Sequence, residues 1–327
     1  MATSGSLVVA INSTTEGLKS GIAEAEGLVS SGAGKMGSLL GAGLAGAATV
    51  GVAAVAGIGT AATGVGVAAV SMANEVNDAT KRMQASLGLT ADEAKELSEV
   101  SRGVFGNNFF ETFGQANDAV IEARKQLQNL SNDELQGVVE GVASISDAFD
   151  TDFSGSLDAV SALTNSLGVD AGKAMDLYTV AMQRGLDVNG DLGDTISEYS
   201  NLFGDAGFSA EQMFDVLEAG SANGVLGVEK AGDAVKEFGI KFTEGADDQR
   251  AAFDALGLDY DAWRNKVNSG EATIADAFFA SQEALSGISG ELDAGALAAG
   301  LMGTQAEDLG KTLATSLAES EGAFADV

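Results

Sequence analysis

Residues 131–145 read Ser131-Asn-Asp-Glu134-Leu-Gln-Gly-Val138-Val-Glu-Gly-Val142-Ala-Ser-Ile145. Ser131 and Glu134 form the pattern of a capping box, in which the hydroxyl and the carboxylate each satisfy a free backbone N–H at the start of a helix. Apolar residues then recur every three or four positions, which is the spacing of one buried helix face. The stretch therefore predicts an amphipathic helix with a defined start.

The same pattern recurs along the rest of the chain. Two more capping boxes, Thr90–Glu93 and Ser209–Gln212, each precede an apolar repeat. Further helices are expected at 156–167, 171–184, 191–203, 227–240, 248–256, 273–286 and 304–318. Glycines expected to act as C-terminal caps are Gly168, Gly185, Gly239 and Gly257. Because proline is absent and strand patterns are negligible after residue 12, we predict an all-α body of many short helices.

The N-terminal residues have a different pattern. Leu7-Val-Val-Ala-Ile11 predicts a short strand. An amphipathic helix is expected behind it, with its apolar positions at Leu18, Ile22, Ala25 and Val29. The N-terminus carries no positively charged segment of the secretory type, so we expect synthesis in the cytoplasm.

Met36–Asn74 is the most unusual segment, with 39 residues that include nine glycines and no charge. A run of this length could span a bilayer, which needs about 20 apolar residues in a helix. Its small residues, including the GxxxG pair Gly37 and Gly41, would also let helices pack closely. Alanine and glycine contribute little transfer energy, which favours a packed or partner-buried segment over a membrane span. Both interpretations stay open.

The charge lies almost entirely after this segment. The chain has a formal charge of −31, and residues 1–74 carry three acids and two lysines, a net −1, which leaves −30 for residues 75–327. Nucleic-acid binding depends on lysine and arginine neutralising phosphates. We therefore expect no sequence-specific nucleic-acid binding.

Two stretches resemble calcium-binding loops, which need alternating oxygen ligands, a glycine at the sixth position and a glutamate at the twelfth. Asp187-Val-Asn-Gly-Asp191 has Glu198 at the twelfth position but Leu192 at the sixth. Asp150-Thr-Asp-Phe-Ser-Gly155 has the glycine but carries Ser161 at the twelfth position. Since each lacks an essential ligand or turn, we interpret both as helix caps and turns.

No pattern in the chain indicates catalysis. Cysteine and histidine are absent, which removes thiolate chemistry, most zinc sites and the commonest general base. No nucleophile stands in a recognisable frame with a base, and no glycine-rich phosphate loop follows a strand. Trp263 is interpreted as a core anchor. We expect no catalytic residue, cofactor or metal, and therefore not an enzyme.

The order of these segments resembles the N-terminal part of phage tail tape measure proteins. Leu7–Lys19 resembles the strand-then-helix start of that family, and the Ala/Gly run follows it, as it often does there. The similarity continues through Asn74–Glu93, Asp152–Gly168, Gly207–Gln212, Ala219–Gly220, Lys230–Gly232, Ala255–Leu258 and Leu301–Ala306. The chain departs from the family at Phe105–Phe110, where the family has a proline-containing turn, and it lacks the family's long coiled coil.

The resemblance implies four segments. These are a strand–helix segment (1–35), the apolar segment (36–74), an acidic helical core (75–310), and the end of the last helix (311–327), which we expect to continue into a missing C-terminal part. The implied function is to set tail length during assembly and to assist genome ejection through the host envelope. A continuous helix of this length would reach at most ~490 Å, so we expect a longer protein or a short tail.

The expected partners are tail tube and tip proteins, tail assembly chaperones and further copies of the chain, three or six in number. The expected locations are the tail interior of the virion, the host cytoplasm during assembly, and the host membrane on infection, where Met36–Asn74 would insert. A membrane-active helical toxin or pore-forming effector is the alternative function, because the same apolar run and acidic body would suit it.

Overall fold

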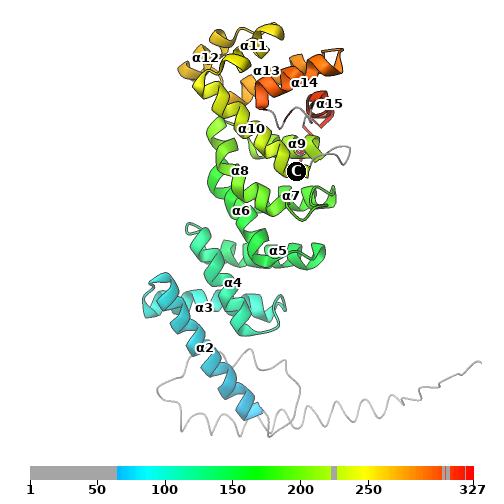
Figure 1. Ribbon diagram of the computed structural model, residues 1–327. Coiled ribbons are helices and arrows are strands. Elements are labelled where there is room, and N and C mark those ends of the chain that lie inside the picture. The colour runs from blue at the N-terminus through cyan, green and yellow to red at the C-terminus, as the bar shows by residue number, and fades with distance from the viewer. Residues whose placement is uncertain (1–64, 222–226, 304–305, 307–309, 321) are drawn as a thin grey trace, which may run out of the picture. The chain divides into compact units, whose positions relative to one another are not determined.

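The computed structural model of the chain (Figure 1) describes residues 65–221, 227–303, 306, 310–320 and 322–327. In these residues the regular structure is helical and contains no strand, which confirms the predicted all-α body. The predicted strand Leu7–Ile11, the helix expected behind it and the first part of the apolar segment, 36–64, lie outside the described residues.

Short helices follow one another along the described chain and are joined by tight turns. In order they are α2 (Val65–Leu87), α3 (Ala91–Gly106), α4 (Phe113–Gln126), α5 (Asn132–Phe149), α6 (Phe153–Leu167), α7 (Ala171–Gln183), α8 (Leu192–Ala206), α9 (Ala210–Ser221), α10 (Gly227–Glu244), α11 (Asp247–Ala255), α12 (Tyr260–Ser269), α13 (Ile274–Ser286), α14 (Glu291–Met302) and α15 (Gly310–Ser320).

Capping boxes start many of these helices. All three predicted boxes are confirmed: Thr90–Glu93 before α3, Ser131–Glu134 before α5 and Ser209–Gln212 before α9. In the second box the Glu134 N–H donates to Ser131 Oγ at 3.3 Å, and the Ser131 N–H donates to Glu134 Oε2 at 2.8 Å. Thr112–Gln115 and Thr273–Asp276 form two further boxes that the sequence reading missed.

The glycine predictions are partly wrong. Gly168, Gly185 and Gly257 do adopt left-handed backbone angles, with φ of 71°, 77° and 76°, just after α6, α7 and α11. Gly239 instead lies inside α10, which continues to Glu244 because Phe242 extends the buried face by another turn. Helices α4, α12 and α14 were not predicted as separate elements.

Val76–Val327 form one compact unit, and α2 begins before this unit and continues into it. The last ten residues of the uncharged segment, 65–74, thus form the first turns of a helix that continues into charged sequence. No helix among the described residues is both long enough and apolar enough to cross a membrane.

The unit Val76–Val327 is held together by packing between helices that are neighbours in space. α6 packs along α8, α9 packs against both α10 and α15, and α11 packs against α14. An aromatic cluster joins several of these helices, since Phe238 contacts Phe242, Phe253 and Phe278 with ring centroids 5.2–6.3 Å apart. Tyr260, 2% exposed, anchors α12, whereas Trp263 is only partly buried at the edge of this core.

Candidate functional site: polar anchors between helices

The two stretches that resemble calcium-binding loops serve as turns and caps. Asp152 Oδ2 accepts from the Gly155 N–H at 3.0 Å and caps α6, the role expected for it. Asp187 Oδ1 accepts from the Leu192 N–H at 2.9 Å, while Asp191 makes no capping bond with its side chain. In the described part of the chain, no three acidic side chains are grouped so that they could hold a metal ion.

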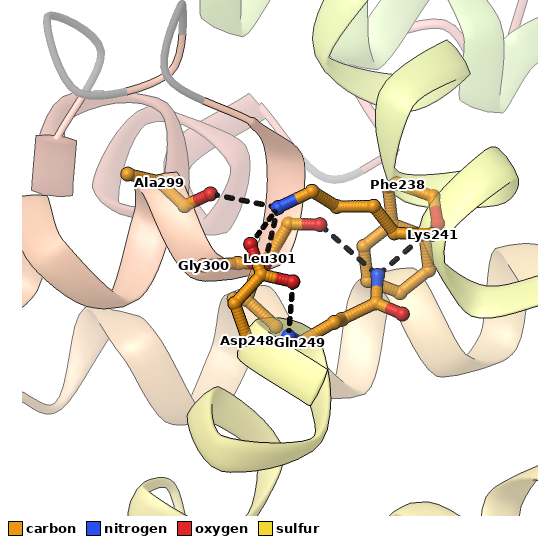
Figure 2. A network of polar contacts seen from close by, with 7 residues as sticks. All are labelled: Phe238, Lys241, Asp248, Gln249, Ala299, Gly300 and Leu301. Carbon is orange, nitrogen blue, oxygen red and sulfur yellow. Dashed lines mark hydrogen bonds and ion pairs between the residues drawn. The ribbon is translucent and has the colours of Figure 1, made fainter. Parts of the chain in front are cut away.

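Lys241 forms the first of two polar anchors and binds the C-terminal end of α14 (Figure 2). Its ammonium donates to the carbonyl oxygens of Ala299 and Gly300 at 3.2 and 3.0 Å, and pairs with Asp248 Oδ2 at 2.6 Å. The last carbonyls of a helix have no partner within the helix and carry partial negative charge. The Lys241 side chain, which is 15% exposed, therefore joins α10 to α14. It supplies a donor to the Gly300 carbonyl and a second donor to the Ala299 carbonyl, which also accepts from the Gly303 N–H at 2.9 Å.

Gln249 of α11 completes this anchor. Figure 2 shows its side-chain amide between α10 and α14, where Nε2 donates to the carbonyl oxygens of Phe238 at 3.1 Å and Leu301 at 3.0 Å. The hydrogen bond from Lys241 lowers the pKa of the Asp248 carboxyl below its usual value, so that group stays charged. The consecutive helices α10 and α11 are thus joined to α14, which lies further along the chain, mainly by polar contacts to backbone.

Asp215 of α9 forms the second anchor. It is the one acidic or basic side chain in the buried polar set of the described residues, at 5% exposure. Its two carboxylate oxygens accept from the backbone N–H groups of Gly322, at 3.0 Å, and Phe324, at 3.3 Å. Burial raises the pKa of Asp215, and the two N–H donors oppose that shift by stabilising the charged form.

These anchors can position helices, but neither contains the parts of a reaction centre. Lys241 and Asp248 pair with each other, and the remaining bonds of both anchors go to main-chain atoms. The sequence reading missed both anchors. For Asp215 there was a signal, because the acid interrupts the apolar run Met213-Phe-Asp-Val-Leu217. For Lys241 there was none, because its partners lie 58 and 59 residues further along the chain.

Comparison with known proteins identifies a protein family. A family model described as "Phage-related minor tail protein" matches residues 92–303, which cover α3 to α14 apart from the first residue of α3. No curated protein and no solved structure matches the chain.

Proposed function

The chain belongs to the phage-related minor tail protein family, and on this premise we propose that it is a tape measure protein that sets tail length during assembly and assists genome ejection. The match over 92–303 carries the proposal, because it spans most of the acidic helical body. A structural role in a phage tail accords with a body built from packed helices and main-chain anchors. We infer a non-enzymatic role from the same features, the packed helices and the main-chain anchors.

The charge of the body suits a place in the tail interior. Residues 75–327 carry a net −30, and such a surface repels the phosphates of DNA. A protein that shares a tube with the passing genome must not bind it tightly. We propose the tail interior of the virion as its location, with the host cytoplasm as the place of assembly.

The proposed partners follow from that location. Tail tube and tip proteins would surround the chain, and assembly chaperones would shield the apolar segment before the tube closes. Three or six copies would match a tube of threefold or sixfold symmetry. The small residues of Met36–Asn74 would let several helices meet at a narrow axis.

The helix lengths bear on how such a protein could measure a tail. The longest described helix, α2, has 23 residues, which corresponds to about 35 Å. The body is therefore not one extended helix, and we propose that it is a compact module of fixed length. Additional helical residues would set the length of a long tail, or the tail would be short.

The test is deletion of the coding sequence in the phage or prophage that carries it. We expect particles without tails, or with tails of irregular length, by electron microscopy, and restoration of one length by the gene in trans. Mass spectrometry of purified virions should detect the chain. Uniform tails after deletion, with the chain absent from virions, would overturn the proposal, and toxicity of the chain alone would then favour the effector alternative.

We also propose that Met36–Asn74 enters the host membrane during genome delivery, after it has been shielded by protein during assembly. The test uses a peptide of residues 30–80 with liposomes, compared with the same peptide carrying Val55→Asp. A charge at the bilayer centre costs about 2.5–3.5 kcal/mol, so leakage and protease protection should be lost in the variant. Full protease accessibility of the unsubstituted peptide, with no leakage at any ratio, would overturn membrane entry.

A further inference from the structure

Residues 322–327, here called the strap, contact helices that lie more than 100 positions earlier in the chain. The contacts come from α7 and α9 and from Arg184, the residue that ends α7. The four side chains that make them, Lys173, Arg184, Phe214 and Asp215, are here called the socket. The socket differs from the Lys241 anchor because a short peptide segment, rather than a helix end, occupies it.

One aromatic side chain anchors the strap. Phe324 is fully buried between the ring of Phe214 and the guanidinium of Arg184. The two rings stack with centroids 5.2 Å apart and planes 30° apart, and the guanidinium carbon lies 4.6 Å from the Phe324 centroid. Aromatic and cation–π contacts of this kind depend on ring geometry, so the socket selects for an aromatic side chain at this position.

The polar contacts of the socket go to the main chain of the strap. Asp215 accepts from the Gly322 and Phe324 N–H groups, and Arg184 Nη2 donates to the Ala323 carbonyl at 2.8 Å. Lys173 donates to the Val327 carbonyl. Recognition through main-chain donors and acceptors, with pockets for individual side chains, is one of the ways in which proteins bind short peptides.

The two cationic groups of the socket also have partners outside the strap. Glu218 accepts two bonds from Arg184 Nη1, at 3.0 and 3.1 Å, and Glu211 pairs with Lys173 at 3.1 Å. Both acids belong to α9. These pairs keep the guanidinium and the ammonium near their binding positions when the strap is away, which lowers the cost of binding.

We propose that the socket is a peptide-binding site for a phenylalanine-bearing segment, and that the strap of a second copy of this chain occupies it where copies are crowded. Each copy carries the matching segment, so exchange between copies preserves every contact at little cost. The copy's own strap competes with an effective concentration on the millimolar scale. Exchange of straps between copies therefore becomes appreciable when the local concentration of the copies is also on the millimolar scale.

The first experiment uses the full chain with Phe324→Ala, which empties the aromatic position, and a fluorescent peptide of residues 320–327. We expect saturable binding to this variant by fluorescence anisotropy. Binding to the wild-type chain should be at least about tenfold weaker, because its own strap competes. The matched controls are the same peptide with Phe324→Ala and the chain with Phe324→Ala and Arg184→Ala together, and both should abolish binding. Absence of binding to a Phe324→Ala chain with native circular dichroism would overturn the site.

A second experiment needs no variant, so it tests the release of the strap even if the Phe324→Ala chain fails to fold. Hydrogen exchange of the wild-type chain should show the Gly322 and Phe324 amides exchanging by local opening, faster than the buried amides of α9. If the strap amides exchange their hydrogens only when the α9 amides do, the strap does not open by itself, and the proposal is wrong.

A third experiment tests whether the strap of a second copy occupies the socket. Sedimentation of the wild-type chain up to about 1 mM should show self-association that a folded Phe324→Ala chain lacks. A strictly monomeric wild-type chain at that concentration, or equal association of the two chains, would overturn exchange between copies.

Discussion

Gly232 of α10 lies directly against the ring of Tyr199 of α8. A Cβ at position 232 would lie 2.8 Å from two ring carbons of Tyr199, closer than real Cβ contacts. The ring cannot easily move aside, because it is 2% exposed and its hydroxyl donates to Asp233 Oδ1 at 2.8 Å. Gly232, which lies inside the helix expected at 227–240, is thus the contact that lets two helices approach.

The first prediction follows from that contact. Gly232→Ala should destabilise the protein by about 1–3 kcal/mol, because overpacking forces the ring or the helix to shift. Gly239→Ala is the matched control in the same helix, since a Cβ there would meet nothing within 4 Å. The control should stabilise by about 0.5–1 kcal/mol, the ordinary gain of alanine over glycine in a helix. Urea unfolding of both variants measures these changes in the free energy of unfolding. Equal changes in the two variants would contradict the close approach of Gly232 to the Tyr199 ring.

The second prediction concerns the Lys241 anchor. Lys241→Met keeps the aliphatic stem but removes the donors to the Ala299 and Gly300 carbonyls. The Gly300 carbonyl then loses its donor, whereas the Ala299 carbonyl keeps the Gly303 N–H. We expect a loss of about 1–3 kcal/mol in thermal or urea unfolding. Lys230→Met in the same helix is the control, because Lys230 forms no ion pair with the described residues, and it should change stability by less than about 0.5 kcal/mol. Equal losses would show that the anchor contributes nothing of its own.

The third prediction uses the capping box of α5. Hydrogen bonds from Ser131, first from its side chain and then from its backbone, lower the pKa of the Glu134 carboxyl. A lowered folded pKa means that this stabilisation is present above the unfolded pKa and is lost as pH falls through the folded one. Ser131→Ala should therefore raise the pKa of Glu134 toward its ordinary value in an NMR titration. Ser144→Ala, an exposed serine in the same helix, should leave it unchanged.

The sequence predicted the parts of the fold that depend on neighbouring residues. Ser131 and Glu134 are three positions apart, so their capping box could be recognised without any knowledge of the fold. The sequence did not predict α14, because apolar and small residues are spread around this helix and form no single apolar face. Gly239 was mistaken for a cap because the burial of Phe242 one turn later depends on α11 and α12, which supply Phe253 and Tyr260. Lys241 and Asp215 bind partners that lie far along the chain. The acid within an apolar run marks Asp215 as unusual, but no local pattern identifies the partners of either residue.

The last prediction uses the three tyrosines, Tyr178, Tyr199 and Tyr260, which are each 2% exposed. Burial raises the pKa of all three phenols above the ordinary value. A group with a raised folded pKa stabilises the fold below its unfolded pKa of about 10 and loses that contribution as pH rises toward the folded value. We therefore expect no tyrosinate absorbance at 295 nm while circular dichroism remains native, followed by a joint rise of absorbance and loss of helix above about pH 10. Tyr178→Phe should remove one third of the final absorbance change. Gradual ionisation centred near pH 10 in a chain that is still helical would contradict the burial of these rings.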